Sequence, residues 1–212
     1  MKLTTTLLTF AMTSAAVVAP SALAQTADLS VTGKIFPNAC TIELGNNGVA
    51  DLGDISTRIL NANSSTVLAP VSLPMSINCT SKTRYGLQGV DNMEGTANAT
   101  FRYGLGLTPD DEKIGGVQIS MRDVSVNGGT AYATISSNSG ASWTSSLGSA
   151  SNLGKTVLLG FAETQGVVTG PAAAEILGAE LVLTPHIEAT RNLTINDDVA
   201  ISGSVTINLT YL

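Results

Sequence analysis

The last fourteen residues alternate strictly between apolar or small side chains and polar ones. The apolar or small side chains occupy the odd-numbered positions, which are Val199, Ile201, Gly203, Val205, Ile207, Leu209 and Tyr211. A repeat of two residues is typical of a β-strand that buries one face. No further strand follows this one in the sequence. The pattern predicts either a strand with an open edge that binds another chain, or an ordinary final strand paired on both sides.

A second alternating stretch lies near the start of the chain. Its members are Ala27, Leu29, Val31, Gly33 and Ile35, and after Pro37 the apolar positions change parity to Cys40, Ile42 and Leu44. A shift of one residue moves side chains to the other face of a sheet, and proline readily interrupts a strand. We therefore predict that residues 25–36 form an arm distinct from a domain spanning 37–212. The alternative is that the arm pairs within its own domain, as first strands usually do.

The first 24 residues are typical of a cleaved signal peptide. Lys2 supplies a positive start, residues 7–18 are largely apolar, and Ala22-Leu23-Ala24 has the form of a cleavage site. The apolar run is shorter than the ~20 residues that a membrane span requires. We expect the mature chain to begin at Gln25 and to be exported without inserting into a membrane.

Composition favours an all-β domain and argues against several kinds of partner. Acidic residues outnumber basic ones by 16 to 10, and charged residues make up only 12% of the chain. Nucleic acid is an unexpected partner, because no basic patch is present. Turn-forming residues separate short strand patterns, which is typical of a β-sandwich. We predict strands over residues 71–79, 85–90, 101–107, 117–121, 131–135, 157–161 and 180–187, and one short helix over 171–178.

The two cysteines are expected to form a disulfide. Cys40 and Cys79 are the only cysteines, and an even number in an exported protein indicates a disulfide. Such a bond stabilises the fold by about 4 kcal/mol on the chain-entropy model. A metal pair is the rival interpretation, but two thiols and one distant histidine make a poor tetrahedral site.

Other candidate sites give weak signals for catalysis. His186 is the single histidine and no G-x-S-x-G motif accompanies it, so a catalytic triad is not indicated. Residues 110–112 are acidic but lack the ligand number of a calcium loop. Ser136, Asn138, Gly140 and Trp143 fit a tight turn with a tryptophan at its end. We expect no catalytic residue, no metal and no cofactor, and no enzymatic activity.

Several of these motifs together resemble the pilin subunits of the bacterial chaperone–usher system. They are the alternating arm, the cysteine pair separated by 39 residues, the Gly-rich stretch 115–119 and the final alternating strand with penultimate Tyr211. The resemblance implies an incomplete immunoglobulin-like β-sandwich that lacks its last strand and is completed by a donated one. Its acceptor groove would be lined by Gly203, Val205, Ile207, Leu209 and Tyr211, and the donor strand would carry Ala27, Leu29, Val31, Gly33 and Ile35. Val199 departs from the family pattern, which often has glycine fourteen residues from the end.

The function that this resemblance implies is structural. Pilin subunits of this kind are exported through the periplasm to surface fimbriae of Gram-negative bacteria, where they support cell adhesion. The implied partners are a periplasmic chaperone, an outer-membrane usher and neighbouring pilin subunits. The alternative is a minor or tip-associated adhesin that binds a host carbohydrate or receptor through the pilin body. Cys40 follows Gln25 by only fifteen residues, which leaves no room for a preceding lectin domain.

Overall fold

The computed structural model describes residues 30–31, 39–146 and 151–212. The chain divides into two units between Phe36 and Pro37, and the description below concerns the second, Pro37–Leu212. The regular secondary structure in the described part of the second unit consists of β-strands and three single-turn 3-10 helices.

The strands have the following bounds. They are β1 (Cys40–Leu44), β2 (Thr66–Val67), β3 (Val71–Thr83), β4 (Tyr85–Asp91), β5 (Tyr103–Gly104), β6 (Gly115–Val126), β7 (Gly129–Thr130), β8 (Tyr132–Ser136), β9 (Thr144–Ser145), β10 (Ser151–Asn152), β11 (Leu158–Ala162), β12 (Ala174–Ile187) and β13 (Val205–Tyr211). The 3-10 helices are η1 (Gly45–Gly48), η2 (Thr57–Ile59) and η3 (Thr190–Asn192).

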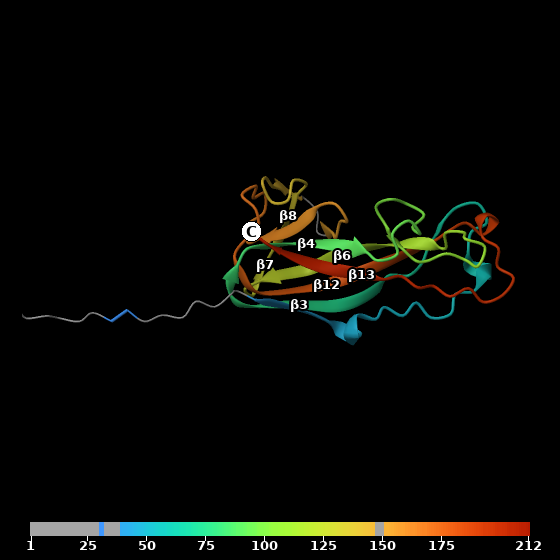
Figure 1. Ribbon diagram of the computed structural model, residues 1–212, viewed down its shortest axis with the longest axis horizontal. Helices are drawn as coiled ribbons and strands as arrows, with labels where there is room; N and C mark the ends of the chain where they lie inside the picture. The colour runs from blue at the N-terminus through green and yellow to red at the C-terminus, as the bar shows by residue number, and fades with distance from the viewer. Residues whose placement is uncertain (1–29, 32–38, 147–150) are drawn as a thin grey trace, which may run out of the picture. The chain divides into compact units, whose positions relative to one another are not determined.

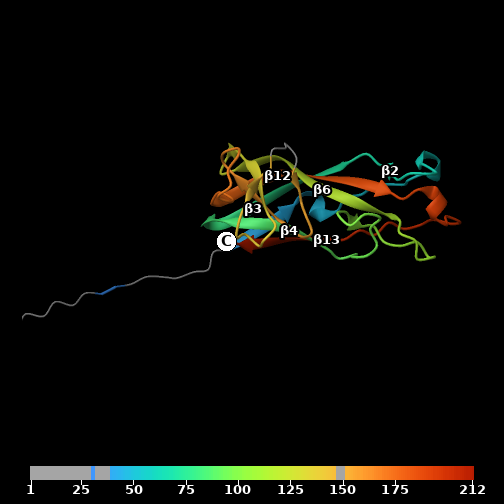
Figure 2. The ribbon, with the colours of Figure 1, turned by 90° about the horizontal axis from the view of Figure 1, so that it is seen from above.

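Two antiparallel sheets face each other as an immunoglobulin-like β-sandwich, which confirms the predicted fold class (Figure 1). The first sheet has the order β1-β3-β12-β6-β10, with short strands β2, β5 and β7 attached to β12 and β6. The second has the order β13-β4-β11-β8-β9. From above, β3, β12 and β6 form one long layer that extends beyond the other sheet (Figure 2).

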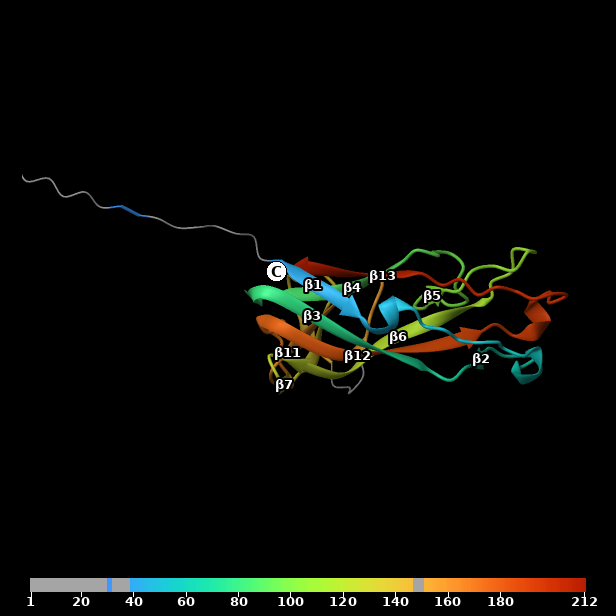
Figure 3. The ribbon, with the colours of Figure 1, turned by 90° about the horizontal axis from the view of Figure 1, so that it is seen from below.

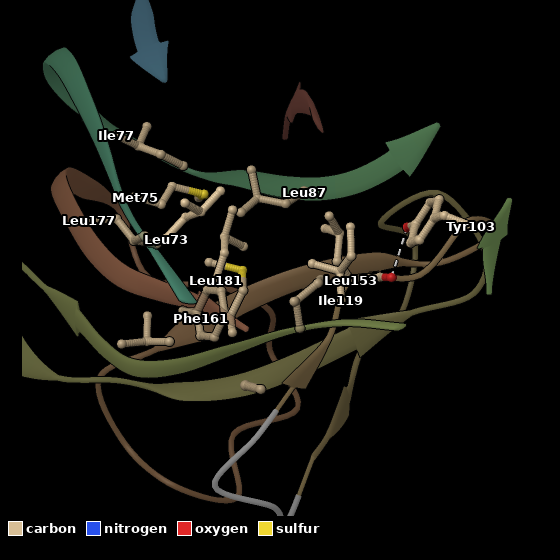
Figure 4. Close-up of a cluster of buried hydrophobic side chains, with 14 of the residues drawn as sticks. Leu73, Met75, Ile77, Leu87, Tyr103, Ile119, Leu153, Phe161, Leu177 and Leu181 are labelled. Atoms are coloured by element: carbon tan, nitrogen blue, oxygen red, sulfur yellow. Dashed lines mark hydrogen bonds between the residues drawn. The ribbon is translucent and has the colours of Figure 1, made fainter. Parts of the chain in front are cut away.

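The core fills the space between the sheets and follows the alternation of the strands. In β3 the residues Leu73, Met75 and Ile77 point inward and are almost fully buried, whereas their neighbours are exposed or half-buried. Leu87 from β4 and Leu159 from β11 face them and have no exposed surface. Figure 4 shows the side chains from β3 and Leu87 beside Leu177 and Leu181 from β12 and Phe161 from β11. Side chains from both sheets thus exclude water from one contiguous core.

The predicted disulfide is present and joins β1 to β3. Cys40 and Cys79 are directly opposite each other in the β1–β3 ladder and their sulfur atoms are bonded. Their Cα atoms are 4.0 Å apart. The bond fixes β1 to the neighbouring strand at the end where β1 begins.

Three predicted elements differ from the structure. The helix over residues 171–178 is wrong, because Ala174 and Leu177 are buried and the chain from Ala174 onward pairs with β3 as part of β12. Ala-rich helix propensity is a weak preference that burial in a sheet outweighs. The strand over 101–107 is reduced to β5, since Gly106 adopts a φ of +92° and turns the backbone. The final strand begins at Val205 and not at Val199.

Pro74 occupies β3 at a position where the strand has only one neighbour. β1 ends at Leu44, opposite Met75, so the residues of β3 before Met75 form a local edge of the sheet. Gly45 lies against the Pro74 ring there. The missing N–H of Pro74 therefore breaks no ladder bond to β1, since proline is tolerated at the edge of a sheet.

Candidate functional site: a groove between two strand edges

The strands β1 and β13 each pair on one side only within the described residues. β1 ends the first sheet beside β3, and β13 ends the second sheet beside β4. The two edges approach each other where β1 begins and β13 ends, because the Cys40 N–H donates a hydrogen bond of 2.9 Å to the Tyr211 hydroxyl oxygen. Figure 3 shows β1 and β13 side by side at this end. The sandwich is consequently open along one side, between these two strands.

The hydrogen-bond pattern identifies which backbone groups of β13 face the opening. Asn92 donates to the Ser204 carbonyl, and Leu212 donates to the Arg84 carbonyl, so even-numbered residues of this segment bond toward β4. In an antiparallel pair the bonded residues alternate along the strand. The N–H and C=O groups of Val205, Ile207, Leu209 and Tyr211 accordingly point away from β4, toward the opening.

The same reasoning applies to β1. Thr80 donates to the Ala39 carbonyl, so the odd-numbered residues of β1 bond toward β3. The backbone groups of Cys40, Ile42 and Leu44 point toward the opening, and the bond from Cys40 to Tyr211 confirms this direction. Both edges therefore offer donors and acceptors to a strand placed between them.

The residues with outward-pointing backbone groups also carry the inward-pointing apolar side chains. Ile42, Leu44, Val205, Ile207 and Leu209 are half-buried and pack against the core, while Thr206, Asn208 and Thr210 between them are exposed. One set of residues thus supplies both a backbone ladder and an apolar floor. This arrangement suits an extended chain with alternating apolar side chains.

A groove of about 850 Å³ lies between the sheets along this side. Its floor includes Leu105, Ile119 and Leu181, and its sides include Leu44, Val205 and Ile207. It extends past the ends of both edge strands to the segments Gly48–Ile55 and Leu193–Gly203, which form no ladder. Most of its lining residues are apolar, and the groove is open to solvent.

The acceptor residues predicted from the sequence occupy different places. Gly203, Val205 and Ile207 line the groove, and Leu209 packs against the core nearby. Gly203 precedes β13, and a Cβ there would lie 3.0 Å from Leu105 Cδ2. Tyr211 is 48% exposed and lies at the end of the opening, where its hydroxyl oxygen accepts the bond from Cys40; its place in the acceptor groove stays a prediction.

The predicted donor residues cannot be placed in the same way. Ala27, Leu29, Gly33 and Ile35 lie outside the described residues, as does the signal peptide. Val31 is described, and its side chain is 89% exposed. The interpretation of this arm as a donor strand stays a prediction.

The sequence did not predict the walls of the groove far from Tyr211. Leu193, Ile195, Val199 and Ile201 line it although none of them belongs to a strand. Val199 and Ile201 belong to the predicted alternation, which indicated their inward direction but did not distinguish a ladder strand from a segment outside the ladders. Leu193 and Ile195 share the same odd parity, but Asp197 interrupts the apolar pattern between them and Val199.

A buried ion pair stabilises β4, the strand that pairs with β13. The Asp91 side chain is completely buried at the end of β4, opposite Val205, and it accepts hydrogen bonds from the backbone N–H groups of Met93 and Gly104. The Nζ atom of Lys155 lies 3.3 Å from Oδ2 of Asp91 and forms the ion pair. The adjacent Tyr103 donates to the Leu153 carbonyl, and burial together with the charge of Asp91 raises the pKa of its hydroxyl (Figure 4). These contacts fix β4 and, through it, one wall of the groove.

Acidic side chains surround the part of the groove far from Tyr211. Asp51, Asp54, Asp197 and Asp198 all line it and are exposed, and no described lining residue is lysine or arginine. None of the four forms an ion pair within the described residues. We call them the acidic rim.

The remaining candidate residues have structural surroundings. His186 lies within β12, where partial burial and then the charge of Arg102 lower its pKa. Glu112 accepts hydrogen bonds from the backbone and side chain of Thr194 and thereby ties its turn to the segment before β13. Trp143 is buried and donates to the Gly140 carbonyl, which closes the predicted turn.

The described residues contain no group of three His, Cys, Asp or Glu side chains that could hold a metal ion. No helix in this part of the chain is long and apolar enough to cross a membrane.

Comparison with known proteins gives one family match. Residues 29–100 match the model of a family described as a protein of unknown function, DUF1120. The match covers the end of the arm, the disulfide and strands β1 to β4, and it carries no assigned activity. No curated protein matches the chain.

Proposed function

We propose that this chain is a structural subunit of a bacterial surface fimbria, assembled by donor-strand exchange. The observation that carries the proposal is the open side of the sandwich. There, beyond the contact between Cys40 and Tyr211, the inward-facing residues of β1 and β13 also point backbone groups into the opening that form no ladder among the described residues. The sequence resemblance to chaperone–usher pilins supports the same function, since that assembly fills such an opening with a strand from another subunit.

The energetics favour an apolar, alternating strand as the occupant. Burial of three aliphatic side chains such as Leu29, Val31 and Ile35 contributes about 5–9 kcal/mol of gross transfer free energy, before the cost of ordering the strand. Ladder bonds to the backbone of Val205 and Ile207 add affinity and fix the register. A strand of this kind also removes two exposed edges that otherwise promote aggregation.

In this proposal a periplasmic chaperone occupies the groove first, and the outer-membrane usher then receives the complex. The arm of a neighbouring subunit replaces the chaperone during fibre growth. The product is a fibre at the cell surface, and the chain has no catalytic role in it.

Co-expression tests the proposal directly. We expect the mature chain to aggregate or polymerise when it is produced alone in the periplasm. With a chaperone of the chaperone–usher type it should form a soluble one-to-one complex, detected by size-exclusion chromatography with light scattering. A mature chain that stays monomeric without a chaperone, and binds neither chaperone nor strand peptide, would refute the open groove.

Two substitutions test the groove and the arm separately. Ile207→Asp puts a charge on the groove wall and should abolish chaperone capture. Ile35→Asp should leave capture intact and block incorporation into fibres. Asn208→Asp is the matched control, because Asn208 lies on the exposed face of the same strand and should behave as wild type. Failure of both Asp variants at the same step would show that the strands are wrongly assigned.

A further inference from the structure

Two asparagines of this chain are each followed directly by a glycine. The pairs are Asn47-Gly48 and Asn127-Gly128. The carboxamide of an asparagine can react with the backbone nitrogen of the next residue, and glycine has no side chain that hinders this approach. Both pairs are therefore candidates for spontaneous loss of the side-chain nitrogen, and the structure distinguishes between them.

The two asparagines have the same backbone conformation, and both are exposed. The φ angle is +51° at Asn47 and +50° at Asn127, and the glycine that follows each of them also has a positive φ. Asn47 lies in η1, directly after β1, whereas Asn127 begins the two-residue turn between β6 and β7. Backbone conformation and access of water are thus matched at the two sites.

The side chain of Asn127 is held by the chain around it. Its Nδ2 atom donates a hydrogen bond of 3.1 Å to the Ala173 carbonyl oxygen and one of 3.4 Å to Glu163 Oε1. Its Oδ1 atom accepts a bond of 2.9 Å from the Glu175 N–H. The carboxamide is thereby fixed to the start of β12, and it can turn toward the nitrogen of Gly128 only after these bonds break.

The side chain of Asn47 has no such partner. It forms no hydrogen bond or ion pair among the residues that the structure describes. The neighbouring Asn46 differs from it, because its Nδ2 atom donates to the Val49 carbonyl oxygen at 2.7 Å. The carboxamide of Asn47 is consequently free to rotate toward the nitrogen of Gly48.

We propose that Asn47 is a site of spontaneous deamidation and that the hydrogen bonds of Asn127 protect the second site. The backbone nitrogen of Gly48 attacks Cγ of Asn47 and gives up its proton, and the side-chain nitrogen leaves with that proton as ammonia. Water then opens the succinimide ring at either of its carbonyl carbons, which gives aspartate or isoaspartate. Each event consumes a water molecule, releases ammonia and adds a negative charge at neutral pH.

The reaction changes one wall of the groove. Gly48 lines the groove, and so does Leu44 at the end of β1. Isoaspartate carries the main chain through its Cβ atom, so the backbone between β1 and the groove-lining segment after it becomes longer by one carbon atom. The new carboxylate also adds charge next to the segment that carries Asp51 and Asp54 of the acidic rim. The inference does not rest on the proposed function, because the reaction requires only the folded chain.

A comparison of the two sites in one molecule tests this inference. The full mature chain, kept soluble by the chaperone or used alone if it proves monomeric, is incubated in mildly alkaline buffer. A second sample is incubated unfolded in urea, where neither side chain is held. Peptide mass spectrometry after reduction of the disulfide measures the deamidated fraction at each site over time, with fragmentation to distinguish Asn47 from Asn46.

In the folded chain we expect Asn47 to react at least about tenfold faster than Asn127, because breaking even two ordinary hydrogen bonds reduces the reactive conformation by about that factor. In urea the two rates should become similar. Asn47→Gly, which suits the positive φ at this position, should remove the fast reaction and leave the rate at Asn127 unchanged.

The inference is overturned by equal rates in the folded chain, by faster reaction at Asn127, or by an intact Asn47 in a folded chain whose unfolded form reacts. A difference between the sites that persists unchanged in urea also overturns it, since the sequence and not the fold would then be the cause. These outcomes leave strand binding untouched, which the co-expression experiment tests separately.

Discussion

Gly89 is a position where a single methyl group should strongly destabilise the sandwich. It lies in β4 opposite Ile207, and the ring of Tyr103 passes directly over it. A Cβ at Gly89 would overlap the Tyr103 hydroxyl oxygen and lie 2.6 Å from Cζ. Tyr103 is 1% exposed, so its ring has no empty space to move into.

The cost of Gly89→Ala has two parts. Overpacking of a core costs about 1–3 kcal/mol, and loss of the buried bond from Tyr103 to the Leu153 carbonyl costs about 1–3 kcal/mol. We expect a loss of about 3 kcal/mol in the free energy of unfolding, measured by urea denaturation of the oxidised chain with the same saturating strand peptide bound to each variant. For a domain of this size the melting temperature should fall by about 6–12 °C.

A double-mutant cycle with Tyr103→Leu isolates the cause. Leucine lacks the Oη, Cζ and Cε atoms that approach Gly89, so Gly89→Ala should cost about 2 kcal/mol less in the Tyr103→Leu background. Gly129→Ala is the control, because a Cβ there meets only ordinary contacts and its effect should be small. The reasoning is refuted if Gly89→Ala costs the same in both backgrounds, or less than 1 kcal/mol in the wild type.

Two further predictions concern the disulfide and the turn at Glu112. Cys40→Ala with Cys79→Ala should lower the free energy of unfolding by about 4 kcal/mol, and a reductant should reproduce this loss in the wild type; an unchanged urea midpoint would contradict it. Hydrogen bonds, first from the Thr194 backbone N–H, lower the pKa of Glu112, so its stabilisation is present above about pH 4.5 and is lost as the pH falls through the lowered pKa. In urea titrations from pH 7 to pH 3 the stability difference between wild type and Glu112→Gln should therefore shrink, and a constant difference would exclude this role.

Much of the fold was predictable because its strands bury one face. The alternation of Leu73, Met75, Ile77 and Cys79 predicted β3, and the structure buries these four residues. The disulfide was predictable from the even number of cysteines together with the predicted signal peptide. The region 171–178 was not, because its local sequence favours a helix and only the neighbouring strands β3 and β6 make it part of β12.

The candidate site was predictable in part. The parity of Val205 and Ile207 indicated the correct inward face, which is a property of the strand itself. The acidic rim and the wall at Leu193 depend on where segments distant in sequence meet, and periodicity contains no such information. Tyr211 has the same parity as the groove residues, yet its position at the end of β13 lets its hydroxyl reach across to Cys40.

The contact between Tyr211 and Cys40 also bears on how a guest strand is aligned. In an alternating sequence, a slip of two residues returns every side chain to its original face, so inward and outward pattern alone leaves several alignments nearly equal in free energy. The hydroxyl of Tyr211 occupies the Cys40 N–H and bridges the gap between the two sheets. A guest that slides toward this end meets a side chain instead of free backbone groups and loses ladder bonds. In the proposed assembly, one residue at this boundary thereby disfavours every alignment shifted toward it, which the repeat itself cannot do.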